Sequence, residues 1–302
     1  MEIVSSEPEF SIRHRRMVPA YSMSGQDARL ASIHTTPGHD PRLVEVVGER
    51  LSLSGKTFNL VTPFSGKSFC LDDYFRGIDR LPISEAHYVV YDNSCDHEFS
   101  AELSEIVKKK FDSYILLVDH NPPSTIDVTD DALTVDARVW AVYKRLLNEE
   151  IADLPYTMIV EDDVEIPEGS YETLHALAES RDDLATVVGS MNNRRKCDNY
   201  PVLWHLRRTY QVGGNFQPET GVVRVVEEKE FGVEIIGSSH LGCWLTKTPV
   251  IKSLGVDRKH EGVHYVDQSW GLAVHNAGYK MAVDWSVKTK HYYLADGKKK
   301  YV

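Results

Sequence analysis

Short runs of β-branched and aromatic residues alternate with segments of helical spacing over residues 57–160. Three strand-like runs come first, at 57–61, 87–91 and 114–118, and a fourth extends from Met158 to Val160. The intervening segments suit helices, at 67–79, 98–111 and 131–150. Strands that alternate with helices of this length imply right-handed βαβ units. The sequence therefore predicts an α/β fold built on a mostly parallel sheet flanked by helices.

The distal part of the chain has a weaker pattern. We expect an antiparallel pair at 222–226 and 233–236, then a helix at about 267–277 and a last strand at about 281–287. Residues 1–50 are polar, with scattered Pro, Gly, Ser and His and no sustained period. They are interpreted as an N-terminal extension or loosely attached cap.

Size and charge fit a soluble globular protein. The 302 residues allow one large domain or two small ones. The formal net charge of −11, from 45 acids against 34 bases, argues against a general electrostatic grip on nucleic acid or anionic lipid. No stretch approaches the ~18 apolar residues of a membrane span, and the N-terminal residues lack the layout of a signal peptide. We therefore expect no transmembrane segment.

The cysteines carry no pattern of a metal or disulfide site. Cys70, Cys95, Cys197 and Cys243 lie far apart without Cys-x-x-Cys spacing. This spacing indicates neither a zinc knuckle nor a disulfide framework, and it fits a reducing cytoplasm best.

Three acids, Glu161, Asp162 and Asp163, directly follow the fourth predicted strand. Side chains at the carboxyl end of a strand in an open α/β sheet point into the crevice where such sheets bind ligands. Adjacent carboxylates repel one another unless a cation lies between them, and oxygen ligands of this kind suit Mg²⁺ or Mn²⁺. A solvated turn is the alternative interpretation.

Two fragments imitate a phosphate-binding P-loop. Ser65-Gly66-Lys67-Ser68 follows a strand and opens a helix, but Val61 stands where the motif requires glycine. Gly55-Lys56-Thr57 has Arg50 at that position and precedes a strand. The sequence therefore excludes a Walker-type ATPase.

The segment His260-Glu261-Gly262-Val263-His264 matches the zincin pattern His-Glu-x-x-His. Glycine inside the segment and a β-branched residue beside it disfavour the helix that this zinc site needs. Trp270 also stands where the extended motif has a third histidine. A zinc metalloprotease is therefore kept as a minor alternative. With no Gly-x-Ser-x-Gly elbow, the sequence supports no covalent catalysis.

Several stretches occur in the order of motifs known from one enzyme fold. They are Thr62-Pro63-Phe64, Val89-Val90-Tyr91-Asp92-Asn93-Ser94-Cys95-Asp96, Glu161-Asp162-Asp163, 236–245, Val266-Asp267 with Ala277-Gly278-Tyr279, and 287–291. The second is similar to Val-Val-Asp-Asn-Gly-Ser-Thr-Asp but lacks its glycine, and the third resembles an Asp-x-Asp metal motif. Over roughly 57–291 the chain resembles a GT-A-fold glycosyltransferase, in particular the inverting family 2-like group.

The resemblance implies a role for each matched residue. Donor binding falls on Thr62, Pro63, Phe64, Asp92 and Asp162. Metal binding falls on Glu161, Asp163 and His291, with Asp163 as the direct anchor. The catalytic base falls on Asp267, and Val266 replaces its usual glutamate partner. The acceptor-side candidates are Trp244, Trp270, Arg194 and Arg195. His240 and His264 receive no role.

The implied architecture is a Rossmann-type, mostly parallel sheet with a smaller mixed acceptor-side sheet. Residues 51–190 would form the nucleotide-sugar-binding half, and residues 191–302 the acceptor-binding and catalytic-base half of the same domain. Within 191–231, basic residues lie among aromatic ones; they are Arg194, Arg195, Lys196, Arg207 and Arg208 with Tyr200, Trp204 and Tyr210. This segment suits an acceptor phosphate, a glycan face or unstacked bases, and equally a solvated loop.

The resemblance implies a metal-dependent, inverting transfer of a sugar from a nucleoside diphosphate sugar, UDP-sugar by default, to an acceptor hydroxyl. Mn²⁺ or Mg²⁺ would neutralise the leaving diphosphate, and a carboxylate would accept the hydroxyl proton. The acceptor is a glycan, lipid, protein or modified nucleic acid. A nucleotidyltransferase and a non-catalytic carbohydrate- or nucleotide-binding module remain alternatives. Asp267 also fits a helix N-cap, and the two tryptophans also fit core positions.

Overall fold

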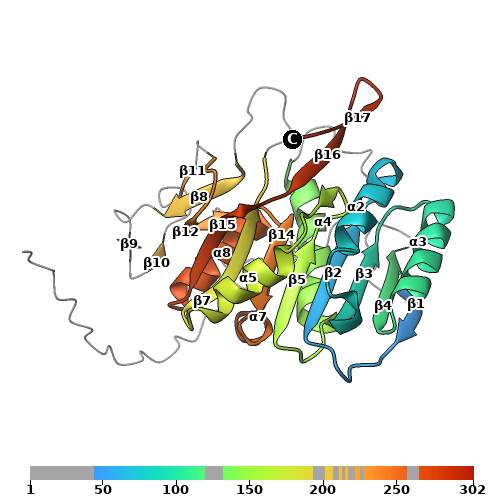
Figure 1. Ribbon diagram of the computed structural model, residues 1–302, viewed down its shortest axis with the longest axis horizontal. Coiled ribbons are helices and arrows are strands. Elements are labelled where there is room, and N and C mark those ends of the chain that lie inside the picture. Colours follow the sequence, from blue (N-terminus) through green and yellow to red (C-terminus); the bar gives the residue numbers. More distant parts are fainter. Residues whose placement is uncertain are drawn as a thin grey trace, which may run out of the picture. The chain divides into compact units, whose positions relative to one another are not determined.

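The computed structural model describes most of the chain outside its N-terminal region (Figure 1). The described residues are 44–119, 132–192, 201–206, 211–212, 215–216, 222–224, 228–256 and 265–302. All of them belong to one compact unit, 36–302.

A nine-stranded sheet forms the centre of this unit, in the order β1-β4-β3-β2-β5-β14-β7-β15-β12 (Figure 1). Its strands are β1 (Val44–Arg50), β2 (Phe58–Phe64), β3 (Ala86–Asp92), β4 (Tyr114–Asp119), β5 (Tyr156–Val160), β7 (Leu184–Ser190), β12 (Val233–Ile236), β14 (Cys243–Lys247) and β15 (Lys280–Lys288). Strands β4, β3, β2 and β5 are parallel neighbours. Strand β14 runs antiparallel between β5 and β7, and β15 is parallel to β7. Most strands of the sheet thus run in the same direction.

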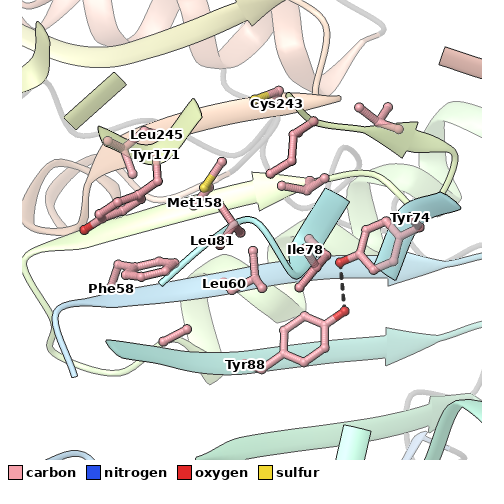
Figure 2. Packing of buried hydrophobic residues seen from close by; sticks show 14 of the residues in the cluster. Phe58, Leu60, Tyr74, Ile78, Leu81, Tyr88, Met158, Tyr171, Cys243 and Leu245 are labelled. Carbon is pink, nitrogen blue, oxygen red and sulfur yellow. Dashed lines mark hydrogen bonds between the residues drawn. The ribbon is translucent and has the colours of Figure 1, made fainter. Parts of the chain in front are cut away.

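Alternate residues of the central strands face two separate hydrophobic clusters. Leu60 and Tyr88 belong to one cluster, whereas their chain neighbours Val61 and Val89 belong to the other. Because side chains alternate across a strand, both faces of the sheet are covered. Figure 2 shows the first cluster, in which Tyr74 and Tyr88 share a hydrogen bond of 2.8 Å between their hydroxyls.

Helices cover each of the two faces. Residues of α2 (Leu71–Ile78), α3 (His97–Lys110) and α5 (Ser170–Glu179) pack in the first cluster. Residues of α4 (Ala132–Arg145), its π-helical extension (Leu146–Glu150), α7 (Thr248–Leu254) and α8 (Val266–Asn276) pack in the second. None of the helices within the described residues combines the length and apolar composition that a membrane span requires.

The central sheet with helices on both faces confirms the predicted α/β class.

The smaller elements differ from the prediction in two respects. Val222–Arg224 (β11) pairs with β8 (Leu203–Leu206), and β12 pairs with β15, so the expected pairing of 222–226 with 233–236 is wrong. Strand β8 also pairs with β13 (Ser238–Ser239), and this small sheet is antiparallel, not mixed. Strand propensity marks these segments, but the tertiary fold chooses their partners.

Several strands lie beyond or outside the predicted set. Strand β15 is followed by β16 (Lys290–Ala295) and β17 (Lys298–Tyr301), so the strand expected at 281–287 is not the last. The hairpin β16–β17 extends away from the central sheet (Figure 1), and β16 pairs with β6 (Val164–Glu165). Residues 44–50, expected to be part of an extension, form β1 along the sheet edge beside β4. The other short elements are η2 (Ser68–Cys70), η3 (Ile83–Glu85), β9 (Gln211–Val212) and β10 (Asn215–Phe216).

Helix α8 approaches the backbone near β13 at a glycine. A Cβ atom on Gly271 would lie 2.2 Å from the Gly237 carbonyl oxygen and 2.9 Å from Ser238 Cβ. The helix can therefore pack at this distance because position 271 has no side chain. This close packing fixes the start of α8, which carries Asp267.

We expect Gly271→Ala to lower the free energy of unfolding by about 1–3 kcal/mol, as overpacking of a core does. Alanine favours an isolated helix over glycine by about 1 kcal/mol, so a loss of stability identifies the contact with Gly237. Urea denaturation measures the change. The half-buried Gln268→Ala on the same helix serves as control, with an expected change within about 0.5 kcal/mol. Equal stability of Gly271→Ala and the wild type would contradict the close contact.

Candidate functional site

The acidic triplet, Glu161 to Asp163, directly follows β5 and contacts the loop before β14 and strand β16. The Glu161 amide donates to the Gly242 carbonyl oxygen (3.3 Å), and the Tyr292 amide donates to the Asp163 carbonyl oxygen (2.8 Å). Strand β5 is parallel to β2, so the triplet lies at the carboxyl edge of the parallel strands. This is the edge at which open α/β sheets bind ligands.

Asp162 fastens the loop that follows β2. Its Oδ2 accepts hydrogen bonds from the Ser65 amide (2.7 Å) and the Ser65 hydroxyl (2.9 Å), and its Oδ1 accepts one from Lys67 Nζ (2.7 Å). The residue is 3% exposed. These bonds join β5 to the loop after β2, two segments nearly a hundred residues apart in sequence. The structure thus shows Asp162 as an anchor of this loop.

Asp163 faces two basic side chains. Its Oδ2 lies 2.8 Å from Lys67 Nζ and 3.5 Å from His291 Nε2. Burial alone would raise the pKa of this carboxyl, but the hydrogen bond with His291 and the charge of Lys67 outweigh it and lower the pKa. Asp163 is therefore held as a carboxylate. Sequence separation between Asp163 and His291 is large, and the pairing of β6 with β16 brings them together.

The orientation of His291 fits a cation at this place. Its Nδ1 lies 3.1 Å from the Asn192 carbonyl oxygen, which can only accept a hydrogen bond, so Nδ1 carries a proton. In a neutral imidazole, the lone pair of Nε2 then points toward the Asp163 carboxylate and is repelled by it. A proton or a metal ion between Nε2 and the carboxylate removes this repulsion. A metal-binding histidine commonly donates its other ring N–H to a backbone carbonyl in this way.

The metal interpretation relies on few protein ligands. Among the described residues, no group of three or more His, Cys, Asp or Glu side chains is arranged to hold a metal ion. Mg²⁺ usually binds through one or two carboxylates plus substrate phosphates and water, without a cage made of protein alone. Asp163 and His291 together fit such a site.

Glu161 connects the acidic triplet to a cavity. The Tyr143 hydroxyl donates to Glu161 Oε1 at 3.4 Å. Burial and, next, the charge of Asp163 raise the pKa of Glu161. The pKa values of these two neighbouring acids thus shift in opposite directions. A cavity of about 210 Å³ begins at Glu161, and its lining also includes Asp267, Tyr265 and Leu241.

Asp267 lies in the first turn of α8, on the wall of this cavity. Its Oδ1 accepts a hydrogen bond from the Gln268 amide (2.7 Å), and its backbone carbonyl accepts one from the Ser238 hydroxyl (3.0 Å). Tyr265 occupies the N-cap position, so Asp267 is inside the helix and not its cap. The positive end of the helix dipole favours a carboxylate here. The structure therefore places Asp267 and Glu161 on one cavity.

The residues expected at the donor pocket are largely engaged inside the protein. Thr62 is buried with its hydroxyl 2.5 Å from that of Tyr74, and Phe64 packs in the first cluster. Pro63 is half-buried between them. Asp92 accepts hydrogen bonds from the Ser94 amide (2.9 Å) and the Ser100 hydroxyl (2.5 Å), which tie the end of β3 to α3. Side-chain contact with a donor is thus open to Pro63 more than to the others.

The acceptor-side candidates divide into two pairs. Trp244 and Trp270 are 2% and 4% exposed and pack in the second cluster, with ring centroids 6.5 Å apart. Trp270 Nε1 donates to the Thr186 hydroxyl (3.0 Å), and Trp244 Nε1 donates to the His240 carbonyl oxygen. These contacts favour core roles, since neither ring lines the 210 Å³ cavity. Arg194 and Arg195 lie outside the described residues, as does the His260–His264 segment.

Two further residues complete the site. Lys67 belongs to the segment that imitates a P-loop, and the structure places its ammonium between Asp162 and Asp163. His240 also lines the cavity, where its Nδ1 accepts from the Gly242 amide (2.9 Å) and its Nε2 donates to the Gly189 carbonyl oxygen (3.0 Å). Burial lowers the pKa of His240 to about 3, so it remains neutral. Its role is to hold the loop before β14.

Comparisons with known proteins support the fold. No protein-family model matches the sequence, and a search of curated proteins also finds no match. Among solved structures, GalNAc-T7 crystallised with UDP, GalNAc and Mn²⁺ aligns over 82% of this chain and 45% of that one, at 14% identity and a TM-score of 0.53. This likeness confirms the mixed α/β fold of GT-A type.

Two more solved structures align with lower scores. S. aureus TarS 1-349 with UDP-GlcNAc covers 75% of this chain and 55% of that one, at 13% identity and a TM-score of 0.42. A197 from STIV covers 81% of this chain and 93% of that one, at 13% identity and a TM-score of 0.41. The chain spans about half the length of the GalNAc-T7 and TarS structures it matches.

We expect Asp162→Ala to lower the free energy of unfolding by about 1–3 kcal/mol, since it removes the buried carboxylate that accepts hydrogen bonds from Ser65 and Lys67. Chemical denaturation measures the loss. Asp79→Ala, which removes an exposed ion pair with Lys110, is the control, and its expected change is within about 1 kcal/mol. If the two substitutions changed stability equally, the anchoring role of Asp162 would be wrong.

Proposed function

We propose that this chain is a metal-dependent, inverting glycosyltransferase. It moves a sugar from a nucleoside diphosphate sugar, UDP-sugar by default, to an acceptor hydroxyl. The observation that carries the proposal is the acidic edge of the sheet, where Asp163 and His291 adjoin Glu161 and Glu161 shares a cavity with Asp267. The fold shared with GalNAc-T7, whose crystal contains UDP, GalNAc and Mn²⁺, supports the same class.

In this proposal Asp163 and His291 hold Mn²⁺ or Mg²⁺, with Glu161 as a weaker partner. When bound, the ion supplies Lewis-acid neutralisation of the leaving diphosphate. Asp163 is suited to this role because its buried carboxylate lies just beyond β5, at the sheet edge where ligands bind. His291 is suited because its Nδ1 is held by the Asn192 carbonyl oxygen, which aims Nε2 at Asp163.

Asp267 accepts the proton of the acceptor hydroxyl as general base. Its carboxylate is partly exposed on the cavity wall, and the Gln268 amide orients one of its oxygens. A single base without a covalent intermediate gives direct displacement at the anomeric carbon, and this geometry inverts its configuration. The acceptor then enters through the 210 Å³ cavity.

The donor nucleotide borders the loops that follow β2 and β3. Thr62, Pro63 and Phe64 form the end of β2 and carry the loop that Asp162 anchors. Asp92 holds the neighbouring loop, so these residues position the donor site chiefly through the backbone. Residues 51–190 thus provide the donor half, and residues 191–302, including Arg194 and Arg195, the acceptor half. The wide spacing of Cys70, Cys95, Cys197 and Cys243, without a Cys-x-x-Cys motif, is consistent with action in a reducing cytoplasm.

We expect Asp267→Asn to reduce the rate of UDP release from a UDP-sugar by about 10²- to 10⁴-fold, because the amide cannot accept the proton. UDP binding in the presence of Mn²⁺ should stay nearly unchanged, since Asp267 does not contact the donor. Coupled detection of UDP and calorimetry measure the two quantities. The exposed Asp182→Asn serves as charge-matched control and should retain wild-type turnover. Wild-type turnover in Asp267→Asn would remove Asp267 from catalysis.

Product analysis tests the reaction class. A thermal-shift panel of nucleotide sugars with and without Mn²⁺ identifies the donor, which is then incubated with the wild-type protein. Free UDP is the expected product. Released pyrophosphate would instead indicate a nucleotidyltransferase. Donor binding without any hydrolysis or transfer would indicate a binding module, and tightly bound zinc after purification would support the metalloprotease alternative.

A further inference from the structure

The ammonium group of Lys67 lies between the two buried acids of the site. Lys67 Nζ is 2.7 Å from Asp162 Oδ1 and 2.8 Å from Asp163 Oδ2. The side chains of these acids are 4% and 2% exposed, whereas that of Lys67 is 29% exposed. Two adjacent buried carboxylates require a compensating positive charge. In this structure Lys67 provides it.

The backbone of Lys67 is fixed, but its ammonium is on a flexible stem. Gly66 adopts φ +77°, and a Cβ atom there would lie 2.9 Å from Ser94 Cβ. The Lys67 carbonyl oxygen accepts a hydrogen bond from the Cys70 amide (3.1 Å). The four-carbon stem can therefore carry the ammonium away from Asp163 while the loop stays in place.

Lys67 and His291 approach the same oxygen of Asp163. Nζ of Lys67 and Nε2 of His291 lie 2.8 Å and 3.5 Å from Oδ2. A divalent ion bound between Asp163 and His291 would therefore meet the ammonium at close range. Like charges at such a distance repel strongly in a buried site. The ammonium and a divalent ion are thus alternative partners of Asp163.

We propose that Lys67 is a built-in counter-cation that competes with a divalent ion for Asp163. The inference rests on the proposed function, in which the donor's diphosphate provides another anion for the displaced ammonium. Lysine binds phosphate as a point charge, so the displaced ammonium pairs with the diphosphate. Binding of the diphosphate therefore accompanies binding of the metal to Asp163. Lys67 thereby makes metal binding depend on the nucleotide, and the protein without nucleotide binds the metal weakly.

The test is Mn²⁺ binding to the full chain without nucleotide, measured by calorimetry. Lys67→Met keeps the stem and removes the charge, and we expect it to bind Mn²⁺ at least tenfold more tightly than the wild type. Lys67→Arg keeps the charge and should bind as weakly as the wild type. Lys110→Met removes a positive charge from an ion pair with Asp79 and controls for net charge. Adding Asp163→Asn to Lys67→Met should abolish the gain.

Thermal unfolding provides a second measurement if Lys67→Met is unstable. Without the ammonium, the buried carboxylates repel each other, so the midpoint in EDTA should fall below that of the wild type. Because a ligand that binds the folded state stabilises it, Mn²⁺ should raise the midpoint of Lys67→Met by more than that of the wild type. An equal rise in both proteins would overturn the proposal.

The inference and the proposed function fail in different ways. Equal Mn²⁺ affinities of Lys67→Met and the wild type, with UDP and Mn²⁺ still binding together to the wild type, would overturn the counter-cation role alone. Absence of UDP binding by the wild type at any Mn²⁺ concentration would overturn the glycosyltransferase proposal. A tenfold gain that persists in the Asp163→Asn background would also reject the inference, because the metal would then bind elsewhere.

Discussion

The structure depends on balancing the charge of Asp162 and Asp163, two buried carboxylates at the end of β5. Burial of an ion without a partner is costly, so positive charge and hydrogen-bond donors must converge there. Ser65 and Lys67 come from the loop after β2, and His291 comes from β16. The requirement thus joins three distant segments of the chain around one site.

The antiparallel strand within the central sheet places further residues around this site. Strand β14 enters antiparallel between β5 and β7, and its preceding loop, held by His240, borders the cavity that Glu161 shares with Asp267. Close packing at Gly271 fixes helix α8 beside β13 and therefore the position of Asp267. The candidate base and the acidic edge thus belong to a single packed unit, although Asp267 lies far from Glu161 in the sequence.

Strong local patterns predicted the parallel half of the fold. The runs at 57–61, 87–91 and 114–118 became β2, β3 and β4, because both-face burial leaves a continuous apolar run. The pairing of 222–226 with 233–236 was not predictable, since short strands have similar propensities and their partners depend on the remaining fold. Likewise, tryptophan carries no sign of whether it lines a ligand site, and Trp244 and Trp270 are core residues here.

The sequence by itself determined the α/β class and the acidic edge, because hydrophobic periodicity and three acids after a strand are local signals. It also suggested the pairing of Asp163 with His291 through resemblance. The tertiary structure decided what these acids contact. Lys67, in a segment that imitates a P-loop, lies between Asp162 and Asp163 because long-range packing brings the loop after β2 against the end of β5. This contact between distant segments is not encoded in local spacing, so only the structure revealed the position of Lys67.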